Sequence, residues 1–227
     1  MDFGRVFKQS FRKAFSKEGF KLSLLTWFVT GLLLLTVFSA GYTQSGSSPA
    51  AFWVALLTVP ISIVVGVMIW IGSVRVLHNE SFDWECFTED IVRTFFTTIG
   101  TYILSGLATM IGLFLLFVPG VIAYTALYIA IPLVVIEGTD VIESLKTSWS
   151  RTKGSRFAIV GLAIVLWAIT SVVLAPFQIG AVLLGSFANP MVYGIAVFIA
   201  SYVGVYTQIL TTAASVAVYE DLSSGDE

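Results

Sequence analysis

The chain has 227 residues, of which 57% are hydrophobic and 11% are charged, and its mean hydropathy is +0.92. Soluble domains contain about 45–50% apolar and about 25% charged residues. The composition therefore excludes an ordinary soluble enzyme and an intrinsically disordered chain. It predicts an integral membrane protein, and the long apolar runs lead us to expect one membrane domain over residues 1–227.

The first 21 residues form a basic segment that contains six cations. The apolar stretch that follows is too long for the apolar core of a cleavable signal peptide, and it lacks an A-x-A site at its end. We therefore expect this stretch to stay in the membrane as a first span. The six cations are Arg5, Lys8, Arg12, Lys13, Lys17 and Lys21.

Phenylalanines recur every fourth residue in the same segment, which places them on one helical face beside the cations. An aromatic face next to a charged face is typical of a helix that lies in the membrane interface. The sequence thus predicts an interfacial helix that contacts the membrane surface. The predicted contacts are Phe3, Arg5, Phe7, Lys8, Phe11, Arg12 and Phe15.

Six apolar stretches approach the roughly 20 residues that a membrane-spanning helix needs. The fourth is the shortest, because about 16 residues barely cross a bilayer. The sequence therefore predicts an all-α membrane protein with six transmembrane helices arranged as three hairpins. The expected spans cover residues 22–41, 52–77, 95–118, 121–136, 157–175 and 191–218.

The positions of the charges predict the topology. All twelve Lys and Arg residues fall within residues 5–21, 75–93 and 146–156. Six spans place these three clusters on one face of the bilayer, and the positive-inside rule makes that face cytoplasmic. Five spans would move the third cluster outside. We therefore expect a multi-pass protein of the cell membrane with both termini in the cytoplasm.

Short connections are expected on the opposite face. Pro119 and Gly120 are expected to form a two-residue turn, in which the proline stops one helix and the glycine permits the reversal. The uncharged segment 177–189 has two interpretations. It either prolongs the fifth helix beyond Pro176 or lies in the interface.

An amphipathic stretch precedes each pair of spans, which indicates an internal repeat. Residues 10–17 resemble residues 144–151, and a glycine follows in both places, as Gly19 and Gly154. The second stretch carries aromatic and aliphatic side chains from Trp84 to Phe95. We infer three parallel units, each with an interfacial helix and a hairpin, and add Trp149 to the membrane-surface contacts. The alternative is that composition alone produces this similarity.

Mixed polar residues gather in a single loop. A metal site is conceivable there, but the spacing matches no zinc signature, and a cytoplasmic loop also explains polar residues. Motifs of the G-x-S-x-G and H-E-x-x-H type are absent. We therefore expect no metal, no cofactor and no enzymatic activity. The loop residues are His78, Asn79, Glu80, Asp83, Glu85 and Cys86.

Small and polar residues line one face of the sixth span at a spacing of four residues. The face could form a polar groove for a solute, because transport needs polar groups at membrane depth. It could equally serve helix packing, in which small residues let backbones approach, and we favour packing. The residues are Ala196, Ala200, Gly204 and Gln208.

Four motifs carry a resemblance to a known family. They are Phe117–Val121, Ile131–Gly138, Glu143–Trp149 with Lys153-Gly154, and Tyr219–Leu222. Together they resemble the six-span domain that precedes the catalytic domain in some bacterial membrane glycerophosphodiester phosphodiesterases, and its stand-alone relatives, many of them from halophilic archaea. The resemblance implies a six-helix bundle with cytoplasmic termini. It implies no phosphodiesterase activity, because these residues hold no counterpart of the catalytic barrel, and it assigns no functional residue.

The sequence predicts a non-enzymatic membrane protein that acts as a scaffold, anchor or assembly partner at the inner face. Its expected partners are the lipid bilayer and a protein that docks on the cytoplasmic side, at residues 78–93 or 138–156. Nucleic acid is not expected, because the cations lie at the membrane surface. The alternative is a transporter or permease for a small or lipidic substrate, which Gln208, Pro60 and Pro132 motivate.

Overall fold

The computed structural model describes residues 1–42, 49–79, 84–187 and 190–224, and this part of the chain is helical without strands. The elements are α1 (Phe3–Ala14), α2 (Lys17–Tyr42), α3 (Pro49–Asn79), α4 (Trp84–Leu115), α5 (Phe117–Ala126), α6 (Ala130–Pro132), a π-helical turn η1 (Leu133–Glu137), α7 (Val141–Arg151), α8 (Arg156–Phe187) and α9 (Pro190–Ser223).

Helices of membrane-spanning length dominate the structure. Five segments in the described part are long and apolar enough to cross a membrane. This confirms the predicted all-α class, whereas the six-span, three-hairpin arrangement stays a prediction. The five segments are Pro60–Asn79, Arg93–Leu115, Phe117–Glu137, Arg156–Gly180 and Val197–Ser223.

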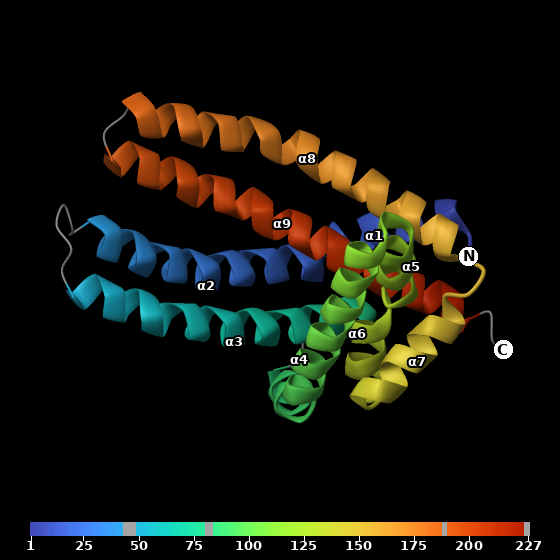
Figure 1. Cartoon of the computed structure of the whole chain (residues 1–227). Coiled ribbons are helices and arrows are strands. Elements are labelled where there is room, and N and C mark those ends of the chain that lie inside the picture. The colour runs from blue at the N-terminus through green and yellow to red at the C-terminus, as the bar shows by residue number, and fades with distance from the viewer. Residues whose placement is uncertain (43–48, 80–83, 188–189, 225–227) are drawn as a thin grey trace.

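Helix α9 occupies a central position. It contacts α1, α2, α3 and α8, and the helix pairs α2–α3, α4–α5 and α8–α9 each pack together. Figure 1 shows α2, α3, α8 and α9 running side by side, with both chain termini at one end. The α4–α5 pair runs in another direction near that end, together with α7. The helices therefore do not all share one axis.

The buried apolar core lies toward the end that holds the termini. Its fully buried side chains come from α1, α3, the turn at residues 127–129, η1, α8 and α9. Helix α1 is thus part of the core, because Val6 and Ala14 are fully buried within it. Five of the largest buried side chains are Ile71, Leu133, Ile159, Leu162 and Val216.

The structure decides between the two interpretations of one helix boundary and corrects another. Helix α8 continues through Pro176 to Phe187, so the uncharged residues up to 187 prolong the fifth helix, as one of the two interpretations held. The second amphipathic stretch, from Trp84, merges with the following span into the single helix α4. The expectation of a separate interfacial helix there is wrong, because residues 84–115 form one uninterrupted helix.

The expected turn at Pro119 and Gly120 is also wrong. The chain reverses at Leu116, whose extended backbone (φ −166°, ψ 151°) separates α4 from α5. Pro119 lies in the first turn of α5, where its missing N–H group costs no helical hydrogen bond. Gly120 allows close helix packing instead. A Cβ atom added to Gly112 of α4 would lie 2.8 Å from the Gly120 Cα atom.

The fourth predicted span, residues 121–136, is an interrupted helix. Helix α5 ends at Ala126, and a turn through residues 127–129 precedes α6 and η1. Pro132 contributes to the break, because it has no N–H group to donate to the carbonyl four residues earlier. Gly138, with φ of 68°, then ends the segment in the left-handed conformation that glycine tolerates.

The close contact of α4 with α5 yields a first prediction. Replacing Gly112 with Ala forces these helices apart and should destabilise the protein by about 1–3 kcal/mol, as overpacking does. Gly106→Ala is the matched control, because it lies in the same helix with open space around it. Thermal unfolding in nanodiscs should show a lower Tm for Gly112→Ala alone. Equal Tm values for the two variants would contradict the tight packing.

Candidate functional site

Three consecutive residues at the end of α9 connect the helices at the end that holds the termini. Tyr219, Glu220 and Asp221 each contact different elements of the chain. We call this region the charged end. It is defined by side chains from α1, α3, η1, α7 and α9, namely Arg5, Gln9, Lys13, His78, Glu137, Arg151, Tyr219, Glu220 and Asp221.

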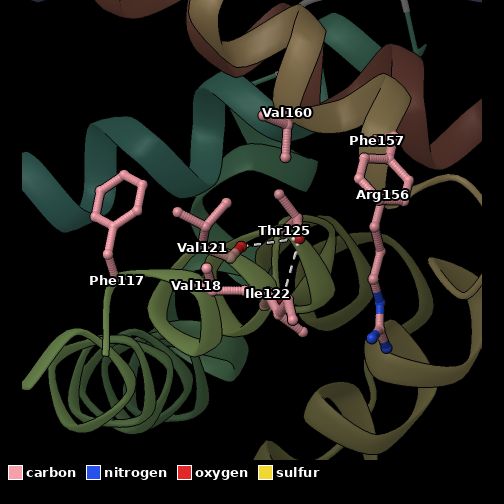
Figure 2. Close-up of a pocket in the computed structure, with 8 residues that line it drawn as sticks. All are labelled: Phe117, Val118, Val121, Ile122, Thr125, Arg156, Phe157 and Val160. Atoms are coloured by element: carbon pink, nitrogen blue, oxygen red, sulfur yellow. Dashed lines mark hydrogen bonds between the residues drawn. The ribbon is translucent and has the colours of Figure 1, made fainter. Parts of the chain in front are cut away.

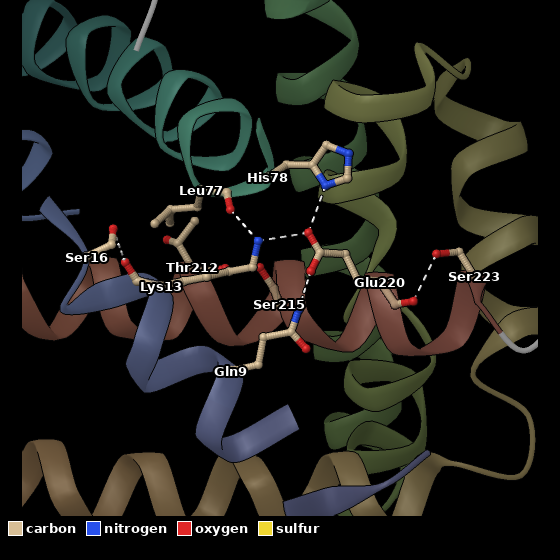
Figure 3. A network of polar contacts seen from close by, with 9 residues as sticks. All are labelled: Gln9, Lys13, Ser16, Leu77, His78, Thr212, Ser215, Glu220 and Ser223. Atoms are coloured by element: carbon tan, nitrogen blue, oxygen red, sulfur yellow. Dashed lines mark hydrogen bonds and ion pairs between the residues drawn. The ribbon is translucent and has the colours of Figure 1, made fainter. Parts of the chain in front are cut away.

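The Lys13 ammonium is the most deeply buried charge of this region, because only 3% of its side chain is exposed. Its Nζ atom donates to Glu220 Oε1 at 2.9 Å and to the Leu77 carbonyl at 2.6 Å (Figure 3). That carbonyl belongs to the last turn of α3, where helix carbonyls have no partner in their own helix. A cation is favourable there because of the helix dipole. Lys13 therefore has two functions: it caps the end of α3, and it neutralises the carboxylate of Glu220.

Both carboxylate oxygens of Glu220 are in use. Besides Lys13, the Nδ1 atom of His78 lies 2.9 Å from Oε1, and the Gln9 amide donates to Oε2. Since the carboxylate only accepts hydrogen bonds, His78 donates from Nδ1. Gln9 and Lys13 come from α1, and His78 comes from the last turn of α3. One carboxylate thus joins α1, α3 and α9.

Tyr219 extends the connections to η1 and α7. Its hydroxyl donates to Glu137 Oε1 at 2.9 Å, and Arg151 Nη1 donates to the same oxygen at 2.6 Å. Glu137 is the last residue of η1, and Arg151 is the last residue of α7. The three side chains therefore tie the interrupted fourth segment to α7 and α9.

Asp221 fixes the beginning of α1. It accepts a hydrogen bond from the Asp2 backbone N–H at 3.1 Å and lies 3.6 Å from Arg5 Nη1. Asp2 is the N-cap of α1, because its own carboxylate accepts from the Arg5 N–H at 3.2 Å. At the other end of α1, the Tyr206 hydroxyl donates to the Ala14 carbonyl at 3.0 Å. Helix α9 thereby holds both ends of α1.

Two hydroxyl groups of α7 satisfy the backbone at the break after α5. Ser148 and Thr152 are fully buried. The Ser148 hydroxyl donates to the Ala126 carbonyl at 2.7 Å, and the Thr152 hydroxyl lies 3.2 Å from the same carbonyl and 2.7 Å from the Ser148 carbonyl. The Ala126 carbonyl lies in the last turn of α5, where it has no helical partner. Ser148, one of the two serines in the motif Glu143–Trp149, thus has a structural function.

The predicted membrane-surface residues of α1 divide into two groups. Phe7 and Phe11 are partly buried against the core, whereas Phe3 and Phe15 are 38% and 65% exposed. The cations are exposed, as is Trp149 on α7. The structure therefore gives α1 one buried face and one exposed amphipathic face. Membrane contact stays a prediction for Phe3, Arg5, Phe7, Lys8, Phe11, Arg12, Phe15 and Trp149.

The small-residue face of α9 points away from the other described helices. Gln208 is exposed, Ala200 and Gly204 are half-buried, and a Cβ atom on Gly204 would meet nothing within 4 Å. The side chain of Ala196 lies outside the described residues. The packing within one chain that we favoured is therefore not seen at Gly204 and Gln208.

The polar loop does not become a metal centre in the part that the structure describes. No group of three His, Cys, Asp or Glu side chains is placed there to hold a metal ion. Residues 80–83 lie outside the described ranges. His78, the first member of the loop, contacts Glu220 instead.

The sequence did not predict the ion pair between Lys13 and Glu220, although each residue lies in a recognisable pattern. Lys13 follows Val6 and Ser10 at spacings of seven and three residues, which places it on their buried face. Glu220 lies in the motif Tyr219–Leu222. Nothing in the sequence pairs these residues, which are 207 positions apart.

The helices and the charged end together define a helical membrane protein. The chain belongs to the family described as Domain of unknown function (DUF7847), whose model matches residues 46–222. No curated protein and no solved structure matches it. The comparisons therefore leave the resemblance to glycerophosphodiester phosphodiesterase membrane domains as a prediction.

The burial of Lys13 yields a second prediction. Glu220→Gln removes the carboxylate that the buried ammonium contacts at 2.9 Å and should destabilise the protein by about 3–5 kcal/mol. The double variant Lys13→Met, Glu220→Gln should recover part of that loss, because it removes the buried ammonium as well. Chemical unfolding of the variants measures both effects. Glu143→Gln is the control, since Glu143 is exposed on α7. A loss no greater than in Glu143→Gln would contradict the coupling.

The capped carbonyl of Ala126 yields a third prediction. Ser148→Ala with Thr152→Val leaves this buried carbonyl without a partner, which should cost about 1–3 kcal/mol. Ser150→Ala is the control, because its exposed hydroxyl bonds only to the Thr147 carbonyl. The Tm measured in nanodiscs should fall for the double variant and not for the control. An unchanged Tm would show that α7 does not support the break.

Proposed function

We propose that this chain is a non-enzymatic, multi-pass protein of the cell membrane that acts as a scaffold or anchor at the cytoplasmic face. The charged end is the part that faces the cytoplasm in this proposal. The lipid bilayer and a protein partner are the expected binding partners.

Two observations support this orientation. The ion pairs bring Arg5, Lys13 and Arg151, from the first and third basic clusters, to one end of the molecule. Both termini lie at the same end (Figure 1). The positive-inside rule then assigns that end to the cytoplasm.

The fixed position of α1 is the observation that carries the scaffold proposal. The buried Lys13 and Glu220 hold one face of α1 on the core, while Lys8 and Arg12 remain exposed on the other face. In the part of the chain that the structure describes, neither Lys8 nor Arg12 forms an ion pair with an acidic side chain. Each cation near an anionic surface contributes about 1 kcal/mol of attraction. We expect these two exposed cations to contact the anionic inner leaflet and an acidic surface of the protein partner.

Transport is the second candidate, and the interrupted fourth segment favours it. Discontinuous membrane helices often line substrate sites in transporters, where free backbone groups bind the solute. In this chain, however, side chains of α7 already occupy the freed Ala126 carbonyl. The scaffold role therefore has the stronger support. Loss of substrate flux in a folded Gln208→Leu variant would favour the transporter.

A co-purification experiment tests the scaffold role as a fourth prediction. The full chain is isolated from its native membrane in nanodiscs, and bound proteins are quantified by mass spectrometry. The double variant Lys8→Gln, Arg12→Gln should lose a stoichiometric partner by about tenfold, equal to roughly 1.4 kcal/mol of binding. Lys21→Gln is the matched control, because Lys21 is exposed but already pairs with Glu18 at 2.8 Å.

Three results would distinguish docking of a protein through α1 from transport. A partner lost from the double variant and kept by Lys21→Gln supports docking through α1. Equal recovery from all variants contradicts it. Recovery of a specific solute without any protein favours the transporter instead.

A further inference from the structure

A groove of about 370 Å³ lies between α5 and the first turns of α8 (Figure 2). Val118, Val121 and Ile122 of α5 form one wall, and Phe157 and Val160 of α8 form the other. The hydroxyl of Thr125 also lines the groove, but it donates to carbonyls of its own helix at 3.0 Å and 3.1 Å. The walls therefore present apolar groups to an occupant.

The cation of Arg156 lies at the edge of this apolar groove. Arg156, the first residue of α8, runs along it, and Figure 2 shows its guanidinium beyond the apolar side chains. Trp149 holds the guanidinium in place, because its ring lies 4.5 Å from Cζ and its carbonyl accepts from Nη2 at 3.2 Å. The Nε atom is buried and has no hydrogen-bond partner within the described residues. An arginine carries five N–H donors, so this one retains capacity for an anion.

The backbone around Arg156 favours an anion as well. The first N–H groups of the long helix α8 have no partner within that helix, and the helix dipole makes its beginning positive. Lys153, exposed in the turn before α8, adds a second cation nearby. In the part of the chain described, none of the ion pairs includes Arg156. Charge complementarity therefore selects a negatively charged group.

The apolar wall continues beyond the groove. Phe114 and Phe157 are each 93% exposed, and Phe117 is 74% exposed. In a membrane protein such surfaces contact acyl chains. An occupant that matches the whole site has a long apolar chain and one anionic group at its end. A membrane phospholipid has this chemistry.

We propose that this groove binds one phospholipid with an anionic head group. Its chain lies between α5 and α8, and its phosphate binds the guanidinium of Arg156. This site goes beyond the scaffold role and does not depend on it, since it uses none of the exposed cations of α1. The scaffold experiment and the lipid experiment can therefore fail separately.

Photocrosslinking tests the site on the full chain. The protein is placed in nanodiscs of phosphatidylcholine and phosphatidylglycerol that contain a phosphatidylglycerol with a diazirine in its chain. After illumination, mass spectrometry maps the label. Peptides with residues 117–125 and 156–160 should be labelled well above the region of Val172, which is an exposed apolar reference on the same helix. Equal labelling of both regions would mean bulk lipid and would overturn the proposal.

Two variants probe the head group and the chain separately. Arg156→Gln should lower labelling of the groove about tenfold against the Val172 reference, as expected for the loss of a charge-assisted hydrogen bond. Val160→Trp should fill the groove and also lower labelling while Arg156 remains. Arg12→Gln is the matched control, because it removes the same charge from α1. Labelling that falls equally in Arg156→Gln and Arg12→Gln, or in neither, would overturn the proposal.

Competition identifies the occupant. Unlabelled phosphatidylglycerol should displace the probe, whereas inorganic phosphate should not. Displacement by phosphate alone would indicate a site for a free anion and would overturn the lipid assignment.

Discussion

The buried ammonium of Lys13 constrains the rest of the charged end. A charged amine that is removed from water needs a counter-charge and hydrogen-bond acceptors, because burying it unpaired costs many kcal/mol. Glu220 and the Leu77 carbonyl provide them, so α1, α3 and α9 must meet at one point. Once Glu220 is placed there, its neighbours Tyr219 and Asp221 lie within reach of Glu137 and the beginning of α1.

The two separate amphipathic helices, α1 and α7, have the same structural function. Each provides a polar side chain to a carbonyl near the end of an apolar helix, Lys13 to Leu77 of α3 and Ser148 to Ala126 of α5. Free carbonyls are costly in an apolar environment, so every interrupted span requires such a partner. This shared function does not extend to the second amphipathic stretch, which is part of α4. The shared function also explains why each of these helices has a buried face that contains polar side chains and an exposed face.

The fold class followed from the sequence because composition and helical periodicity are local properties. Helix ends were less predictable. The break at residues 127–129 depends on hydroxyls of α7, and the reversal at Leu116 depends on the close contact of Gly112 with Gly120. The site was the least predictable part. Lys13 and Glu220 pair across the folded structure, and a single sequence does not report contacts between distant residues.

Hydrogen exchange of α1 tests most directly whether the Lys13–Glu220 pair holds the charged end together. Backbone amides of Phe3–Ala14 should be protected in nanodiscs and should exchange at least about tenfold faster in Glu220→Gln, because opening of α1 becomes easier by more than roughly 1.4 kcal/mol. Amides of α8, which does not contain the pair, should keep their protection. Unchanged protection of α1 in that variant would contradict the account, since the other contacts of α1 would then hold it without the Lys13–Glu220 pair.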